Sequence, residues 1–446
     1  MNFQVLYVPI GVPTFELVSA RDLLHKSVQL LTSICKDTIC PDDILLSLDA
    51  LTAYLDGKKP DLIVLQNVTF ANAAYASEVL KRFSAPVLLW TLREPVIDGG
   101  RLRLNSLTGA FSAANAIREF RKGEQFEYVF GSPEEKEVIQ QIKSTVAAAK
   151  IRTELKELRI AAIGHTPEGF GFGRALDVDM MKTFGSKLIS IEARELIDKA
   201  KAYTDDEAQP YFEKAQKSIV GLETMPDKNV KDFSRLYKAY SEYVTENKIG
   251  ALASRCWPDF FTSFGTPVCS VLSLLNMDGI AASCESDIYG ALSVYIGSKL
   301  TGSACFFGDP VSLDESENTI TFWHCGMAAC SLARKDTGAC AGVHCNRKIG
   351  PTMEFGCAPA PESTIFRIGR LPDGSFRMFI ASGEILDKPK QFNGTSIVVK
   401  TDNCSKDIVT TAVKDGWEPH FVVVYGNIVH ELTALCHMLN LAVSSY

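Results

Sequence analysis

Two acidic residues and two histidines stand where short apolar segments of the chain end or begin. Glu285 closes DGIAASCE, Asp309 closes SACFFGD, His324 closes TITFWH, and His420 opens HFVVVYG. Residues at strand ends reach the mouth of an α/β sheet, where ligands bind. Two carboxylates and two imidazoles that converge there would form a site for a divalent metal such as Mn²⁺ or Mg²⁺. Such a site can polarise a carbonyl group and assist proton transfer beside it.

The apolar surroundings of the two acids support this prediction. Glu285 follows IAASC and precedes the apolar SDIYGALSVYI, and Asp309 lies between CFFG and PVS. A buried carboxylate is costly unless it is paired or bound to a metal. A surface position for each acid, and a core position for His420, are the alternatives. Among the other histidines His344 is the main candidate, because it opens the polar loop HCNRKIG.

The elements that must position these residues follow from the hydrophobic pattern. Residues 1–155 and 156–310 alternate strand-like runs with helical periods, which is typical of βαβ units around a parallel sheet. After residue 310 the strands become short and alternating, and LPDGSF is a hairpin turn. We therefore predict an α/β protein with two Rossmann-like parallel-sheet domains, 1–155 and 156–310. A C-terminal antiparallel β-barrel-like domain, 311–446, follows them.

Composition narrows the class of protein. The 446 residues carry a net charge of −7 without a basic block, which argues against nucleic-acid binding. No apolar run reaches the roughly 18 residues of a membrane span. The opening MNFQVLYVPIG resembles a strand and not a signal peptide, so we expect a cytoplasmic protein. The 13 cysteines are then free thiols of a reducing compartment.

Three other motifs have alternative interpretations. Cys325, Cys330, Cys340 and Cys345 could hold zinc or an iron–sulfur cluster, although their spacing is wider than that of most structural zinc sites. The glycines of 169–174, GFGFGR, could bind a nucleotide, but they lack the G-x-G-x-x-G spacing, so a turn that lines a pocket or packs closely is favoured. Cys284 is expected to be a structural cysteine rather than a nucleophile.

Segments along the whole chain resemble the L-fucose and L-arabinose isomerase family. They are AAIGHTPEGFGFGRALDVDMMKTFG, SRCWP, CESDIYGALSVYI, FFGDP, FWHCG and HFVVVYGNI, in this order. The resemblance implies that Glu285, Asp309 and His420 match the acid, acid and histidine that bind manganese in fucose isomerases. His324 stands where arabinose isomerases have a further histidine ligand.

The resemblance also implies an assembly and a class of substrate. It implies two Rossmann-like domains, a β-barrel-like domain and a homo-oligomer, often a hexamer. The N-terminal domain of a neighbouring subunit would cover the site with the loops GVPTFE, LQNVTF and LWTLREP. The chain is shorter than the fucose isomerases proper and resembles a shorter branch, some of whose members act on sulfonated sugars such as sulfoquinovose. The resemblance therefore leaves two classes of substrate open: a sugar of the L-fucose or D-arabinose type, and a sulfonated hexose.

We therefore expect a metal-dependent aldose–ketose isomerase that works through a cis-enediol with Mn²⁺, Mg²⁺ or Co²⁺. Glu285 and Asp309 are the expected catalytic carboxylates, in roles that the sequence leaves unassigned. Arg255, Trp257 and His344 are candidates for substrate binding, with packing as the alternative for Arg255 and Trp257. A metal-dependent aldolase or epimerase, and a non-catalytic sugar-binding protein, are the alternative functions.

Overall fold

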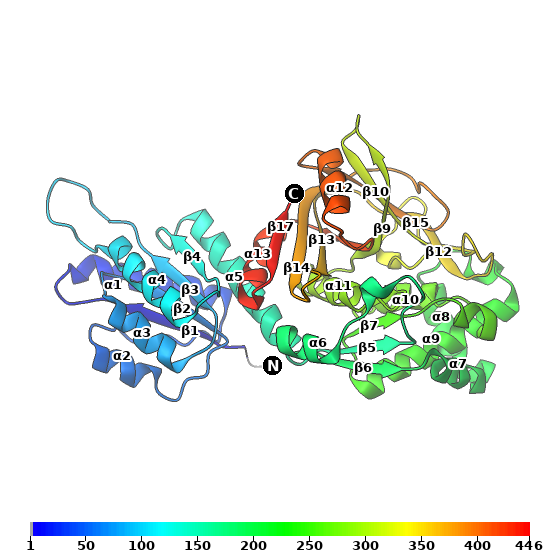
Figure 1. Cartoon of the computed structure of the whole chain (residues 1–446), viewed down its shortest axis with the longest axis horizontal. Coiled ribbons are helices and arrows are strands. Elements are labelled where there is room, and N and C mark those ends of the chain that lie inside the picture. The colour runs from blue at the N-terminus through cyan, green and yellow to red at the C-terminus, as the bar shows by residue number, and fades with distance from the viewer. Residues whose placement is uncertain (1–2) are drawn as a thin grey trace. The chain divides into compact units, whose positions relative to one another are not determined.

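The computed structural model describes residues 3–446, which form two compact units (Figure 1). The first unit comprises the described part of Met1–Glu154 together with His430–Leu441. The second unit comprises Leu155–Val429 and Ala442–Tyr446. The chain therefore leaves the second unit for one helix near its C-terminus and then returns to it.

The first unit is built on a parallel sheet in the strand order β1-β2-β3-β4. Its strands are β1 (Val5–Ile10), β2 (Leu62–Asn67), β3 (Val87–Thr91) and β4 (Glu127–Phe130). Its helices are α1 (Leu17–Ile34), α2 (Leu48–Leu55), α3 (Ala73–Arg82), α4 (Ser106–Phe120), α5 (Lys136–Leu155) and α13 (Val429–Leu439). Of the segments that the family resemblance implied as covering elements, GVPTFE follows β1, while LQNVTF and LWTLREP span the carboxyl ends of β2 and β3.

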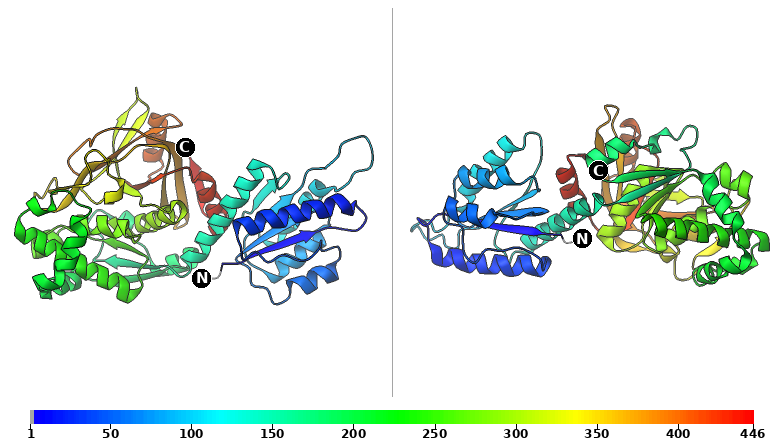
Figure 2. Two further views of the ribbon diagram at one scale, coloured as in Figure 1. Left: turned by 180° about the vertical axis from the view of Figure 1, so that it is seen from behind. Right: turned by 90° about the horizontal axis from the view of Figure 1, so that it is seen from below.

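Helices cover both faces of this sheet (Figure 2). Alternate strand residues such as Leu6 and Val8 pack with α2, α3 and α4, whereas Val5 and Tyr7 pack with α1 and α5. Burial on both faces explains why the strands are continuous apolar runs. The helix α13 joins this unit through Glu431, which accepts from the Ser144 hydroxyl at 2.8 Å.

The second unit begins with another parallel sheet, in the order β6-β5-β7-β8. Its strands are β5 (Arg159–Ile163), β6 (Lys187–Ile191), β7 (Ala251–Ser254) and β8 (Ala281–Cys284). The α-helices are α6 (Asp177–Phe184), α7 (Ala193–Ala202), α8 (Asp205–Gln216), α9 (Asp227–Asn247), α10 (Cys269–Met277) and α11 (Ile288–Thr301). The order reverses between β5 and β7, and ligands of open α/β sheets bind beside such a reversal, at the carboxyl ends of the strands.

A mixed sheet completes the second unit, in the order β11-β12-β15-β10-β9-β16-β13-β14-β17. Its strands are β9 (Phe306–Asp314), β10 (Thr319–His324), β11 (Cys340–Gly342), β12 (Thr352–Gly356), β13 (Ala360–Arg370), β14 (Phe376–Ile385), β15 (Thr395–Thr401), β16 (Phe421–Tyr425) and β17 (Ala442–Ser445), with helix α12 (Ser405–Lys414) before β16.

The prediction of two parallel-sheet regions is confirmed. The prediction of a wholly antiparallel C-terminal region is wrong, because β12 pairs in parallel with β15 and β17 with β14. These two strands are reached by long connections, which allow parallel pairing.

Helix α11 joins the two sheets of the second unit. Its residues from Ile288 to Gly297 are all buried, because it packs on β7 and β8 and also on β13 and β16. This burial explains why its sequence lacks a polar face. Although α11 is apolar, no helix within residues 3–446 is long and apolar enough to cross a membrane.

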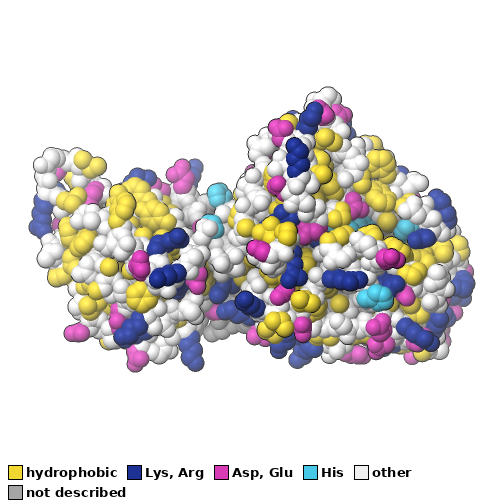
Figure 3. Space-filling view, viewed as in Figure 1, with side chains coloured by type: hydrophobic (Ala, Val, Ile, Leu, Met, Phe, Trp, Pro, Cys, Tyr) yellow, Lys and Arg dark blue, Asp and Glu magenta, His cyan; other side chains and the backbone are white. Residues whose placement is uncertain are grey.

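Charged side chains of both signs are distributed over the molecular surface. On the face shown in Figure 3, Lys and Arg lie among Asp and Glu and do not gather into one large basic area.

Candidate active site

Glu285 leaves β8 in an unusual backbone conformation. Glu285 and Ser286 have φ values of +59° and +54°, and this left-handed region costs a non-glycine residue about 1–2 kcal/mol. Neighbouring contacts hold the turn. The Ser286 hydroxyl donates to the Ile163 carbonyl oxygen at 3.2 Å, and Asp287 caps α11 by accepting from the Gly290 N–H at 2.9 Å. Backbone strain of this kind clusters at functional sites.

His420 precedes β16 and contacts Glu285. Its Nε2 atom is 2.9 Å from Oε2 of Glu285 and 3.6 Å from Oδ1 of Asp309. The strand β16 pairs with β9 so that Phe421 lies opposite Gly308, and this register places His420 beside Asp309. The ring is only 1% exposed. The structure therefore brings together three of the predicted residues.

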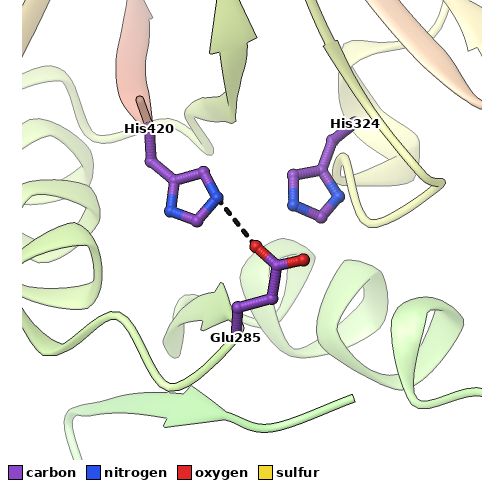
Figure 4. Close-up of side chains that lie close together, drawn as sticks. All are labelled: Glu285, His324 and His420. Atoms are coloured by element: carbon purple, nitrogen blue, oxygen red, sulfur yellow. Dashed lines mark ion pairs between the residues drawn. The ribbon is translucent and has the colours of Figure 1, made fainter. Parts of the chain in front are cut away.

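His324 ends β10 and completes the cluster. One ligand atom from each of Glu285, His324 and His420 lies within 4.8 Å of the others, and Figure 4 shows these side chains pointing toward one another. The His324 Nδ1 atom accepts from the Cys325 N–H at 2.9 Å, so the neutral ring carries its proton on Nε2. In residues 3–446 this is the one group of acids, histidines and cysteines with the spacing of a metal site. Carboxylate oxygens and imidazole nitrogens fit a divalent transition metal.

Arg255 and Trp257 lie in the loop after β7, at the same sheet edge as Glu285. The Arg255 side chain is already engaged: Nε lies 2.8 Å from the Asp259 carboxylate and 3.1 Å from the Trp257 carbonyl oxygen, and Nη1 is 2.8 Å from His165 Nε2. The Trp257 ring meets Phe170 edge-on with centroids 6.1 Å apart. Both residues thus join a wall of the site formed by the loops after β5 and β7.

His344 is buried and holds its own loop. Its Nδ1 atom accepts from the N–H groups of Asn346 and Arg347, each at 3.3 Å. Its ring packs edge-on against Phe261 with centroids 5.0 Å apart. The structure therefore uses Nδ1 of His344 to shape the loop.

The glycine-rich segment packs closely against the Glu285 turn. A Cβ atom on Gly173 would lie 2.8 Å from Cα of Asp287, so only glycine fits without a shift. Phe172 beside it meets His420 edge-on with ring centroids 5.5 Å apart. This supports the interpretation of 169–174 as a packing segment rather than a phosphate loop.

The cysteine cluster suggested by the sequence does not form a metal site within the described residues. All 13 cysteines are free thiols. Cys330 contacts Met353 Sδ at 3.6 Å and Ser273 Oγ at 3.5 Å, while the Cys340 thiol approaches the Thr337 carbonyl oxygen. Soft packing contacts account for these two side chains.

The sequence was compared with known proteins and domain families. Residues 324–446 match the family model of the L-fucose isomerase C-terminal domain. A sulfoquinovose isomerase of Clostridium sp. (strain MSTE9) is 60% identical over 445 residues, covering 100% of this chain and 99% of that relative. Sulfoquinovose isomerases of Priestia aryabhattai and Alkalicoccus urumqiensis are 39% and 37% identical and cover at least 98% of both chains. The chain belongs to the fucose-isomerase-like family. It is an aldose–ketose sugar isomerase. The alternatives of an aldolase, an epimerase or a sugar-binding protein gain no support from these relatives.

Within the site of this isomerase, burial and neighbouring charged groups shift the pKa values of the acids and the histidines in different directions. Burial raises the pKa of Asp309 to about 6 and lowers that of His324 to about 4. Burial alone would lower the pKa of His420, but hydrogen bonds with Asp287 and Glu285 outweigh it and raise the pKa to about 9. Burial likewise opposes ionisation of Glu285, yet His420 and His324 hold its pKa below the usual value. A positive charge is therefore strongly favoured between the carboxylates.

The prediction from sequence missed two residues that position His420 in this isomerase. Asp287 accepts from Nδ1 of His420 at 2.9 Å, and Arg367 donates to the His420 carbonyl oxygen at 2.8 Å. The position of Asp287 just before an apolar helix is an N-cap signal, which could have singled it out. Arg367 lies in the strand IFRIGR and shows no local sign of being buried.

Proposed function

We propose that this isomerase converts sulfoquinovose, an aldohexose with a sulfonate group at C6, into the corresponding ketose with the help of a divalent metal. The convergence of Glu285, His324 and His420 within 4.8 Å carries the proposal of metal dependence. The names of the relatives at 60%, 39% and 37% identity support the choice of substrate.

The metal would be held by Glu285, Asp309 and His420, with His324 as the fourth group. For His324 to bind a cation through Nε2, its Nδ1 would give up the hydrogen bond from Cys325, because a neutral ring has one free lone pair. We expect Mn²⁺, with Mg²⁺ or Co²⁺ as replacements, since mixed oxygen and imidazole ligands suit these ions. A bound cation would supply Lewis-acid stabilisation of negative charge on the sugar oxygens.

The reaction transfers a proton from C2 to the neighbouring C1 of the sugar. One carboxylate takes the proton from C2 of the open-chain aldose, giving a cis-enediol, and the proton is delivered to C1 to give the ketose. The second carboxylate assists proton transfer between O1 and O2. Glu285 and Asp309 both lie against His420, so each is within reach of a sugar held there. Trp257 would stack on the apolar face of the sugar.

A barrel-like arrangement of the C-terminal strands would hold these groups rigidly. The pairing of β14 with β15 closes a ring of strands β15, β10, β9, β16, β13 and β14. Asp309, His324 and His420 lie on or beside three of these strands. A rigid support for catalytic groups preserves the geometry on which rate depends.

We also propose a homo-oligomer, as the family resemblance implies. Support comes from apolar side chains on α4 and β4 of the first unit: Phe111 is 74% exposed, Leu107 43% and Tyr128 42%. Exposed apolar patches commonly mark protein interfaces. Light scattering of the purified enzyme and of Phe111→Asp tests this, and an unchanged monomeric mass for both would contradict it.

Turnover of a panel of aldoses tests the proposed function. The purified enzyme would be assayed with sulfoquinovose and with neutral hexoses, with Mn²⁺ and after EDTA. We expect metal-dependent ketose formation from sulfoquinovose and little from the neutral sugars. Glu285→Gln should abolish turnover while it preserves the circular dichroism spectrum. Equal activity after complete metal removal, or no ketose from sulfoquinovose, would refute the proposal.

A further inference from the structure

A short loop after β11 carries two adjacent cationic side chains. The loop runs from Val343 to Gly350, and its ends are tied together because the His344 N–H donates to the Ile349 carbonyl oxygen at 2.9 Å. The Lys348 N–H donates to the His344 carbonyl oxygen at 2.8 Å. Together with the bonds to the His344 ring, these contacts define the loop backbone while Arg347 and Lys348 remain exposed.

The Arg347 guanidinium has an aromatic neighbour and no acidic one. It lies over the Trp257 ring at 5.7 Å from the centroid. Among residues 3–446, no carboxylate or other side-chain acceptor is hydrogen-bonded or ion-paired with it. In contrast, Arg255 in the loop after β7 is paired with Asp259 at 2.8 Å. The charge of Arg347 is therefore not neutralised by a carboxylate within the described residues.

A continuous line of aromatic contacts connects Arg347 to the metal-binding cluster. Trp257 contacts Phe170 with ring centroids 6.1 Å apart, Phe170 contacts Phe172 at 5.5 Å, and Phe172 contacts His420 at 5.5 Å. His420 stands at one end of this line of rings and Arg347 at the other. The loop of Arg347 also lies close to the cluster by a shorter route, because the Cys345 thiol contacts the thiol of Cys325, the residue after His324. A sugar whose reacting end lies at the cluster would therefore have its far end toward this loop.

We propose that Arg347 binds the sulfonate group of the substrate and thereby selects a sulfonated sugar over a neutral one. The inference rests on the proposed function. A guanidinium presents planar, paired donors that match the oxygens of an oxyanion. The Trp257 ring fixes the guanidinium in place before substrate arrives, which reduces the entropy lost on binding. Arg347 is thus a specificity-determining residue, and the cluster around His420 performs the reaction.

A pair of charge-removing variants tests this inference. Arg347→Met keeps an unbranched stem over Trp257 and removes the charge. Lys348→Met removes one charge from the neighbouring position and is the matched control. Each metal-loaded enzyme would be assayed with sulfoquinovose and with D-quinovose, which has the same carbon skeleton without the sulfonate.

We expect Arg347→Met to lower kcat/KM for sulfoquinovose roughly 10- to 100-fold, in line with the loss of a charged hydrogen bond. Its kcat/KM for D-quinovose should stay within about twofold of the wild-type value, and Lys348→Met should change neither sugar by more than about twofold. Melting temperature and metal content of both variants should match the wild type.

Three results would overturn the inference. Unchanged kcat/KM of Arg347→Met for sulfoquinovose would show that another group binds the sulfonate. An equal loss for both sugars would show a structural role instead. An equal loss in Lys348→Met would show that general attraction, and not a specific contact, favours the anion.

Failure of the wild-type enzyme to isomerise sulfoquinovose would refute the proposed function itself, and the inference with it. If the wild type is active, the first three results refute the inference alone.

Discussion

Asp287 and Arg367 form a fully buried ion pair behind the candidate metal ligand His420. Oδ2 of Asp287 lies 2.8 Å from Nη1 of Arg367, and both side chains are 1% exposed. The pair holds His420 at two points, because Asp287 meets the ring Nδ1 and Arg367 meets the backbone carbonyl oxygen. A carboxylate on the outer nitrogen of a histidine fixes its tautomer and leaves the inner nitrogen free for a metal.

Replacement of Asp287 by Asn should weaken metal binding. Asn keeps the shape but lacks the charge that fixes the His420 tautomer, so we expect Mn²⁺ affinity to fall about 10- to 100-fold, as for other carboxylates that hydrogen-bond to a metal-binding histidine. Titration calorimetry of the metal-free protein would measure this. The matched control is Asp402→Asn, which makes the same change at an exposed position and should leave the affinity unchanged. Equal affinities of Asp287→Asn and wild type would show that His420 is positioned without Asp287.

Replacement of Arg367 by Met should mainly destabilise the fold. Removing one member of a buried ion pair leaves the other charge without compensation and costs about 3–5 kcal/mol. Urea unfolding would measure the loss. The control is Lys406→Met, which breaks the exposed pair of Lys406 with Glu315 and should cost less than about 1 kcal/mol. A similar small loss in both variants would contradict the expectation.

Two glycines of the 169–174 segment offer a matched steric test. In Gly173→Ala the new Cβ would meet Cα of Asp287 at 2.8 Å, whereas the Cβ in Gly171→Ala would have no neighbour within 4 Å. Overpacking at Gly173 costs about 1–3 kcal/mol and would displace the turn that carries Glu285. We expect kcat/KM to drop roughly 10- to 100-fold in Gly173→Ala and to stay unchanged in Gly171→Ala. Steady-state kinetics and melting curves would decide, and full activity of Gly173→Ala would show that the turn tolerates the shift.

Metal affinity should rise with pH. Although burial opposes it, the hydrogen bonds of Asp287 and Glu285 raise the pKa of His420 to about 9 in the metal-free protein. The ring is then protonated at neutral pH, and a metal must displace that proton. The apparent affinity for Mn²⁺ should increase about tenfold per pH unit from pH 7 and level off near pH 9. Below pH 6, protonation of Asp309, whose pKa burial raises to about 6, should weaken binding further.

Calorimetry at pH 7 in two buffers of different ionisation enthalpy would count the released protons. We expect about one proton per metal at that pH. No proton release, with metal demonstrably bound, would mean that His420 is neutral before the metal binds.

The sequence alone predicted the parts of this protein that local patterns encode. Alternating strands and helices identified the two parallel sheets, because a buried parallel strand must be apolar on both faces. Polar residues at the ends of apolar runs predicted a site of Glu285, Asp309, His324 and His420, because a buried charged residue needs a partner. Of these, Glu285, His324 and His420 converge in the structure.

Tertiary structure decided everything that depends on contacts between distant segments. Asp287 and Arg367 are 80 positions apart, and Asp287 and His420 are 133 apart, so neither pairing leaves a mark in the residues next to it. The parallel pairing of β17 with β14 likewise depends on where the chain returns after α13. The contact of the Arg347 guanidinium with the Trp257 ring likewise joins two loops that are far apart along the chain. Electrostatic pairing depends on distance in space, and the order of residues along a chain does not specify that distance.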